Sequence, residues 1–403
     1  AFITAGFFLS YFDRILMVVV AEAVKGEFSL SDKEVSILTG AAFILLYSLG
    51  GVPLGWALDR FSRKGMLAGA LALWSAATFA CGLAGSFIAL TISRAIVGLG
   101  EAVIVPAGTS IVSDQFPPER RPLGSSMFYA GGLVGVLAAF VGGSWVAAEY
   151  GWRTAFLVAG PPGLILGALM LFFMPEPVRE RATDRQGPKV NSYALIASNR
   201  PLVWLLAAQS IATFASVGLM SWLPMFFIRS HGMSLKEIGL LFGPALACGS
   251  VFGVLLGGWL GNRLASRSTG ALVVWCGLVV FAIVPLYLAT FWVGSQAVAL
   301  LATFAATALT LTYTPCYTAA SQTICDPRTR GATAGIANFV NNVVGGAICT
   351  YVVGAMSDAW RPTAGEESLR YALTVGVIGF CIVAGCMFFR SAALLKRQAQ
   401  GRA

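Results

Sequence analysis

Long apolar runs separated by short polar stretches constrain this chain more than any other feature. Of its 403 residues, 57% are hydrophobic and only 11% are charged. At a rise of about 1.5 Å per residue, roughly 20 apolar residues in a helix cross the ~30 Å hydrocarbon layer of a bilayer. Because a backbone in lipid must satisfy its own hydrogen bonds, these runs should be helices. We therefore predict an all-α membrane protein with twelve transmembrane helices.

The predicted spans lie near residues 1–24, 34–58, 65–84, 88–113, 123–147, 153–174, 202–228, 235–260, 270–290, 296–324, 331–356 and 371–391. The first span begins with the first residue, so we expect further residues to precede Ala1.

The positive charges are distributed unequally between the two sides of the predicted membrane. If the chain starts in the cytoplasm, 18 of the 27 Lys and Arg residues fall on the cytoplasmic side and 7 on the outer side. This is the positive-inside bias, and it predicts that both termini are cytoplasmic. Topology thus explains the net charge of +9, and we expect no nucleic-acid partner.

The sequence offers few residues for metal binding or covalent catalysis. Its eight cysteines lie in or at the ends of apolar runs, without the spacing of a metal site, and His231 is its single histidine. Cysteines in such runs are typical small hydrophobic fillers. We therefore expect no metal, no cofactor and no enzymatic activity.

A polar, proline-containing stretch divides the predicted spans six and six. It covers 175–201 and separates an N-terminal bundle, 1–174, from a C-terminal bundle, 202–403. The sequence GWALDRFSRK at 55–64 returns as GWLGNRLASR at 258–267, and YAGGLVG at 129–135 returns as FVNNVVG at 339–345. The halves are therefore related copies, an organisation in which substrate binds near the membrane midplane between the repeats.

Four charged residues lie inside two of the predicted spans, namely Asp13 and Arg14 in the first and Arg94 and Glu101 in the fourth. A charge at the centre of a membrane helix costs about 2.5–3.5 kcal/mol on insertion scales, so such residues usually serve a function. The helix rise places the first pair at a depth between Arg94 and Glu101, which share one helical face. If the two helices face each other, the four charges can form a network.

Within this network we expect Glu101, the deepest of the four, to be the main proton carrier. Asp13, held ionised by Arg14 or Arg94, is the second candidate. The two arginines are predicted to receive an anionic head group, because guanidinium pairs bidentately with carboxylate or phosphate. The alternative is a permanent salt-bridge network that only fixes the first helix against the fourth.

The C-terminal half carries polar and aromatic residues in its spans where the N-terminal half carries charge. These candidates are Gln209, Thr213, Tyr313, Tyr317, Asn338, Asn341 and Asn342. Asn341 and Asn342 stand where the first copy has Gly131 and Gly132. They either line the cavity or form hydrogen bonds between helices.

Two motifs resemble signatures of the major facilitator superfamily. GWALDRFSRK is similar to its cytoplasmic loop motif, and RAIVGLGEA at 94–102 is similar to its fourth-helix motif. The resemblance implies rocker-like alternating access, with the first and fourth helices facing each other across the cavity. It also implies a cytoplasmic gate, formed by Asp59, Arg60, Arg63 and Lys64 and, in the second copy, by Asn262 and Arg263.

The finer resemblance is to bacterial members of the Spinster family. It rests on YFDR at 11–14, GLGEA at 98–102, GWR at 151–153 and SWLPMFFIRSHGMS at 221–234. It implies a transporter of lysophospholipids or sphingosine-phosphate-type lipids. We expect a monomer in the bacterial inner membrane that is coupled to protons, with protons and membrane lipids as its partners. The alternative is a proton-coupled symporter of small organic anions such as sugar acids, because such symporters share the charged residues.

Overall fold

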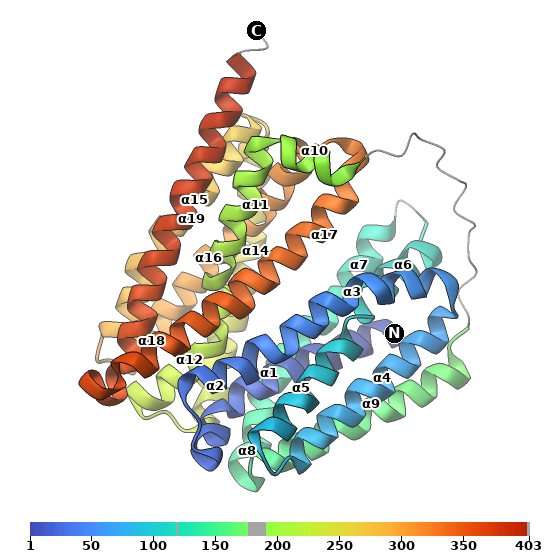
Figure 1. Cartoon of the computed structure of the whole chain (residues 1–403), viewed down its shortest axis with the longest axis vertical. Coiled ribbons are helices and arrows are strands. Elements are labelled where there is room, and N and C mark those ends of the chain that lie inside the picture. The colour runs from blue at the N-terminus through green and yellow to red at the C-terminus, as the bar shows by residue number, and fades with distance from the viewer. Residues whose placement is uncertain (118–119, 176–190, 401–403) are drawn as a thin grey trace. The chain divides into compact units, whose positions relative to one another are not determined.

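The computed structural model describes residues 1–117, 120–175 and 191–400 (Figure 1). Within these ranges every regular element is a helix, so the predicted all-α class is confirmed. Eleven stretches are long and apolar enough to cross a membrane. The last, Pro327–Gln398, contains two span-length helical stretches, residues 330–364 and 368–400, separated by the short 3-10 turn η8 (Gly365–Glu367). The described part therefore holds the twelve spans of the predicted architecture.

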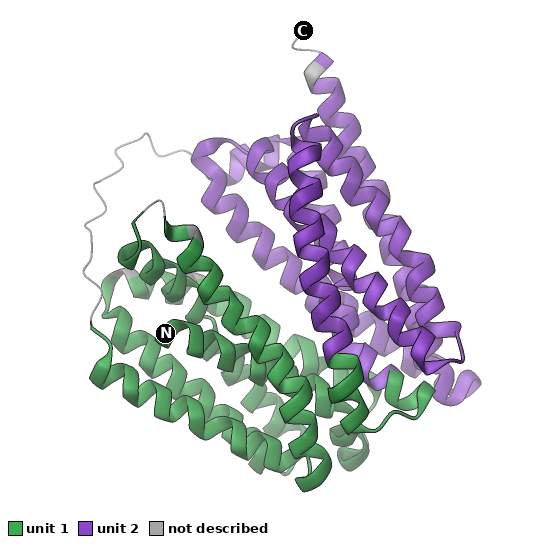
Figure 2. Cartoon of the chain, turned by 180° about the vertical axis from the view of Figure 1, so that it is seen from behind, with its two compact units in different colours: residues 1–186, 227–243 green, residues 187–226, 244–403 purple. Residues whose placement is uncertain are grey.

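The chain forms two compact units, coloured separately in Figure 2. Unit 1 comprises residues 1–186 and 227–243, and unit 2 comprises residues 187–226 and 244–403. The segment 227–243 belongs by sequence to the C-terminal half but groups by its contacts with the N-terminal half. The predicted linker 175–201 falls mostly on residues outside the described ranges; near its end lies the short helix α10 (Ser192–Ser198).

The N-terminal half of the chain, which forms most of unit 1, contains α1 (Phe2–Phe28), α2 (Asp32–Ser36), η1 (Ile37–Ala41), α3 (Ala42–Arg60), α4 (Arg63–Leu83), α5 (Phe87–Glu101), α6 (Ile104–Gln115), α7 (Arg121–Ala138), η3 (Ala139–Gly143), α8 (Ser144–Tyr150) and α9 (Trp152–Phe173). Helix α4 packs on α9, α1 packs on α7, and α5 packs on both α3 and α4.

The rest of the chain contains α11 (Arg200–Ala212), η4 (Thr213–Ala215), α12 (Gly218–His231), α13 (Leu235–Glu237), η5 (Ile238–Phe242), α14 (Gly243–Ala265), α15 (Thr269–Trp292), α16 (Gln296–Ile324), η6 (Pro327–Thr329), α17 (Arg330–Val340), η7 (Asn341–Ile348), α18 (Cys349–Ala364) and α19 (Ser368–Gln400). In unit 2, α15 packs on α16 and α19, and α19 also packs on α11 and α18.

Serine side chains mark the starts of several of these helices. Ser62, Ser86 and Ser268 each accept a hydrogen bond from the backbone N–H three residues ahead, which satisfies one of the unpaired donors of the first turn. Ser31 and Ser234 form full capping boxes with Glu34 and Glu237. Each box leads within a few residues into a π-helical segment, η1 or η5, so the internal repeat extends to local backbone geometry.

The predicted span 88–113 is interrupted directly after Glu101. Helix α5 ends there, and α6 begins at Ile104. Pro106 has no N–H with which to bond the carbonyl of Ala102, four residues earlier, so the regular ladder fails at this point. The break places Glu101 at a helix end rather than in the middle of a continuous helix.

Two glycines set the close helix contacts around the charged residues. A Cβ at Gly98 of α5 would overlap the backbone carbonyl of Phe43 on α3, and a Cβ at Gly135 of α7 would overlap that of Phe8 on α1. Small residues at helix interfaces allow this approach in membranes. Gly142, by contrast, has no atom within 4 Å of a Cβ position.

The contact at Gly98 yields a stability prediction. Replacing Gly98 by Ala should lower the thermal unfolding temperature in detergent, because overpacking a tight contact costs about 1–3 kcal/mol. Gly69→Ala on the neighbouring helix α4 is the matched control, since nothing lies within 4 Å of its Cβ position. An unchanged melting temperature for Gly98→Ala would mean that α5 and α3 do not approach as described.

Candidate functional site

The charged residues of the first and fourth spans meet within unit 1. Nη2 of Arg14 lies 3.1 Å from Oε2 of Glu101, forming an ion pair between α1 and α5. Ser10, one turn before Arg14, donates a 2.7 Å hydrogen bond to the same carboxylate oxygen. Glu101 is fully buried, whereas the Arg14 side chain is 24% exposed. Within this ion pair, the carboxylate is shielded from solvent and the guanidinium is partly accessible to it.

Asp13 and Arg94 are arranged differently from our expectation. Asp13 is buried, and its Oδ2 accepts a 3.0 Å hydrogen bond from Thr78 of α4. Arg94 donates a 3.4 Å hydrogen bond to the backbone carbonyl of Asp13 rather than to its carboxylate. Neither Arg14 nor Arg94 forms an ion pair with Asp13 in the described part of the chain, and Arg14 is paired with Glu101 instead.

Aromatic rings surround the Arg14 guanidinium. Its central carbon lies 4.6 Å from the ring centre of Phe43 and 5.0 Å from those of Tyr11 and Tyr47. Rings at this distance attract a cation through their negatively polarised faces. Phe43 also lies 5.2 Å from the guanidinium carbon of Arg94, so one ring contacts both arginines. The rings hold Arg14 in place while leaving part of it accessible.

Several polar atoms of this charged cluster (Asp13, Arg14, Arg94 and Glu101) have no hydrogen-bond partner among the described residues. They are Oδ1 of Asp13, Oε1 of Glu101, Nε of Arg14, and Nε and Nη2 of Arg94. Leaving a buried polar atom unpaired is costly, and such atoms call for a functional or solvent explanation. Both carboxyl groups therefore have a free oxygen that can take up a proton.

The polar residues predicted in the C-terminal half gather in unit 2. Ser210 of α11 donates a 3.1 Å hydrogen bond to Asn341 of η7, and the hydroxyl of Tyr313 donates a 3.3 Å bond to the carbonyl of Ala212. Asn341 thus bonds between helices, one of the two roles considered for it. Asn342 of η7 bonds instead to Asn338, one turn earlier in the preceding helix α17, and Asn338 is exposed in unit 2.

Two more of these residues keep unpaired atoms. Gln209 donates a 3.5 Å hydrogen bond to Thr213, but its Oε1 has no partner among the described residues. The buried hydroxyl of Tyr317 is likewise unpaired in that part of the chain. These two groups remain available for a polar ligand or water.

The residues predicted to form the cytoplasmic gate lie at the ends of α3, α4 and α14. Arg63 forms an ion pair with Asp114 at the end of α6. Arg60 lies over the ring of Trp56 at 3.7 Å, and Arg263 lies over Trp259 at 3.9 Å, so the repeat preserves an Arg–Trp pair.

The other three gate candidates contribute less to this picture. Lys64 is half-buried in the first turn of α4, and Asn262 is exposed near the end of α14. The side chain of Asp59 lies outside the described part of the structure.

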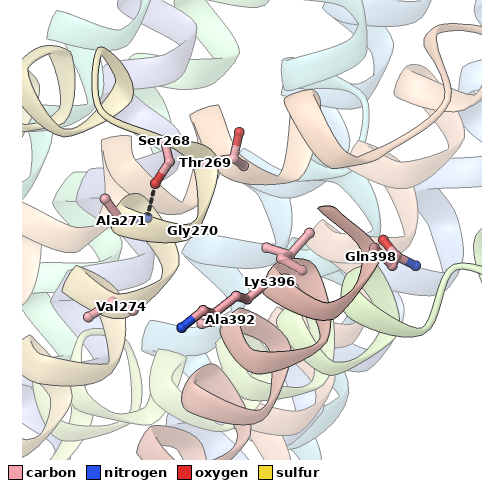
Figure 3. Close-up of a pocket in the computed structure, with 9 residues that line it drawn as sticks. Ser268, Thr269, Gly270, Ala271, Val274, Ala392, Lys396 and Gln398 are labelled. Carbon is pink, nitrogen blue, oxygen red and sulfur yellow. Dashed lines mark hydrogen bonds between the residues drawn. The ribbon is translucent and has the colours of Figure 1, made fainter. Parts of the chain in front are cut away.

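A separate groove of about 680 Å³ lies in unit 2 between the start of α15 and the end of α19 (Figure 3). Its lining includes Ser268, Thr269 and Val274 on one side and Ala392, Leu395 and Lys396 on the other. Ser268 is already engaged in capping α15. None of the predicted site residues lines this groove.

Some contributors to the site were not among the sequence-predicted residues. Ser10, Phe43, Tyr47 and Thr78 complete the surroundings of the charges, and Asp114 is the partner of Arg63. Ser10 lies one turn before Arg14, so helical spacing alone could have indicated it. The others come from neighbouring helices, and only the packing identifies them.

Known proteins resemble this chain along most of its length. The sphingosine-1-phosphate transporter of Xenopus tropicalis is 27% identical over 97% of this chain and 80% of its own length. An efflux pump of Mycolicibacterium smegmatis is 28% identical over 96% of this chain and 91% of its own length. The cis,cis-muconate transport protein of Acinetobacter baylyi is 29% identical, but over only 64% of each chain.

A solved structure shares the fold. A bacterial homolog of the human lysosomal transporter Spinster, in an inward-facing and unoccupied conformation, superposes with a TM-score of 0.89 at 24% identity, covering 97% of this chain and 96% of that one. The predicted resemblance to Spinster proteins is thereby confirmed. The family model described as Major Facilitator Superfamily matches residues 3–350. The chain therefore belongs to the major facilitator superfamily and is a multi-pass membrane transporter rather than an enzyme.

Proposed function

We propose that the protein transports an amphipathic lipid or lysolipid with an anionic or zwitterionic head, by alternating access coupled to protons. The observation that carries the proposal is the ion pair between Arg14 and Glu101, which joins a partly exposed cation to a fully buried carboxylate. We place the protein in a bacterial inner membrane, as a monomer with both termini in the cytoplasm. The charge bias of the loops supports this orientation.

The ion pair supplies a physical link between proton and substrate. An anionic head group and the Glu101 carboxylate compete for the same guanidinium, because each neutralises Arg14. A proton on Glu101 removes that competitor and frees Arg14 for the head group. Proton binding and anion binding then favour each other, which is the requirement for coupling.

The accessible arginine in this arrangement is Arg14. Arg94 is only 1% exposed, and it bonds to the backbone of Asp13. We therefore assign head-group contact to Arg14 and give Arg94 the task of positioning α1 against α5. Asp13 remains a second proton site, since its Oδ1 has no partner among the described residues.

Two observations favour a lipid over a small organic acid. Rings from Tyr11, Phe43 and Tyr47 surround the guanidinium, which suits a head group that is joined to an apolar chain. The sphingosine-1-phosphate transporter also aligns over 97% of this chain, against 64% for the muconate transporter. A proton-coupled symporter of organic anions such as sugar acids stays the second candidate, because a probable galactarate/D-glucarate transporter of Bacillus subtilis is among the relatives.

The proton role predicts the behaviour of Glu101→Gln. The amide preserves the size of the side chain and can still accept from Ser10, but it cannot carry the proton. Uptake driven by a pH gradient in proteoliposomes should be abolished, while binding of the lipid probe persists. Ser10→Ala, which removes only the hydrogen bond, should keep pH-driven uptake. Undiminished pH-driven uptake by Glu101→Gln would remove Glu101 from the mechanism.

The substrate class predicts a pattern of ligand-induced stabilisation. Lysophosphatidylcholine and sphingosine-1-phosphate should raise the melting temperature, whereas muconate and glucarate should not; a ligand at 100 times its Kd adds about 2.7 kcal/mol. Arg14→Gln should abolish the shift. Arg60→Gln, which changes an exposed arginine stacked on Trp56, should preserve it. Stabilisation by the hydrophilic acids alone would overturn the lipid assignment.

A further inference from the structure

A second group of charges in unit 1, two of them buried and two half-buried, is not used by the proposed function. Glu22 and Lys25 lie in the last two turns of α1, Asp32 is the first residue of α2, and Arg229 lies in the last turn of α12. We call these four residues the outer cluster, because the charge bias assigns this end of the helices to the outside.

Arg229 is the hub of the outer cluster. Its Nη1 and Nη2 donate to the two oxygens of Asp32 at 3.0 and 2.9 Å, a bidentate pair. Its Nε and Nη2 donate to Oε2 of Glu22 at 2.9 and 2.8 Å. Lys25 also pairs with Asp32, which is only 1% exposed. Two cations thus balance two carboxylates, and without Arg229 the buried Asp32 would lie in a net negative group.

Arg229, which completes this charge balance, lies in a segment whose contacts are with one unit while the chain on either side of it belongs to the other. Residues 227–243 group with unit 1, while the chain on both sides of them belongs to unit 2. The segment also packs on unit 1 at its far end, where a Cβ at Gly239 would contact Ser144 and the ring of Phe242 lies 5.5 Å from that of Phe140. Arg229 and Gly239 therefore mark the two ends of one docked segment.

The internal repeat argues against a purely architectural role for this docking. The capping boxes at Ser31 and Ser234 lie 203 residues apart and correspond to each other. At this spacing Leu235 stands where the first copy has Asp32, and Arg229 stands where it has Gly26. The fold is repeated without the charges, and buried ion pairs seldom stabilise a fold better than packed apolar groups.

We propose that the outer cluster is an ionic latch: segment 227–243 docks on unit 1 through Arg229 and undocks during the transport cycle. The proposal rests on alternating access in the proposed function. In the docked state, the bidentate and largely buried ion pairs of Arg229 hold the segment on unit 1. When the segment undocks, the separated charges become hydrated, and this hydration compensates for the lost ion pairs. The segment alternates between two discrete positions, as a conformational switch requires.

Hydrogen exchange of the full chain in nanodiscs tests the latch without any substrate. Arg229→Gln should raise exchange at least tenfold in residues 22–33 and 227–243 and leave the rest of unit 1 unchanged, because local opening exposes only the released amides. Lys236→Gln is the matched control. It breaks the Lys236–Glu149 pair in the same segment, whose side chains are 50% and 40% exposed, and exchange should stay at the wild-type level. Unchanged exchange in Arg229→Gln, or a rise throughout unit 1, would overturn the proposal.

A crosslink tests whether undocking is part of the cycle. The Cβ of Ser144 lies 3.2 Å from the Cβ position of Gly239, near the ~3.5–4.5 Å separation in disulfides. Oxidation of a Ser144→Cys, Gly239→Cys double variant should stop uptake of the lysophosphatidylcholine probe, and reduction should restore the rate that the same variant showed before oxidation. The reduced double variant is the reference, because a Cβ at Gly239 also crowds the carbonyl of Phe140. Oxidation should leave the uptake rate of the Ser144→Cys single variant unchanged. Uptake by the fully crosslinked protein at the reduced rate would overturn the proposal. If the proposed function is wrong, the wild-type protein will not take up the probe. The hydrogen-exchange experiment, which needs no substrate, then tests the latch by itself.

Discussion

The ion pair between Arg14 and Glu101 is the interaction on which the rest of unit 1 depends. Neither charge is tolerated alone at membrane depth, so the surrounding helices must bring the two together and hold them there. Gly98 allows α5 to approach α3, which carries the Phe43 and Tyr47 rings beside the guanidinium. The break after Glu101 fixes where α5 ends. Helix packing and the charged cluster are therefore parts of a single arrangement.

Much of the fold follows from the apolar runs alone. The spans are long, and lipid forces each of them to be helical, so their number and type could be predicted from the sequence. Boundaries were less predictable where a side chain or proline acts locally. Pro106 interrupts the fourth span, and the final helix, α19, continues to Gln400, beyond its apolar run. Such effects depend on single backbone hydrogen bonds, which an average over a window of residues does not resolve.

For the candidate site, the sequence identified the charged residues but not their pairing. Helix rise gives depth, and periodicity gives a face, but neither gives the rotation of one helix against another. We expected Arg14 or Arg94 beside the carboxylate of Asp13, whereas Arg14 pairs with Glu101 and Thr78 bonds to Asp13. Thr78 and Phe43 come from helices whose approach depends on interhelical packing. Similarly, the sequence alone does not indicate that Arg229 pairs with Glu22 and Asp32, because these residues lie far from it along the chain.

The shared ligation of Arg229 has a consequence for how this sequence can diverge. A change at Arg229 leaves Lys25 as the single cation beside Glu22 and Asp32 in the outer cluster, so the effects of substitutions at Arg229 and Asp32 should not be additive. The contact joins two residues that lie nearly two hundred positions apart, whereas the counterpart of Arg229 in the first copy is the uncharged Gly26. The two halves therefore share a repeated scaffold but carry different charges at corresponding positions, so one copy could not replace the other.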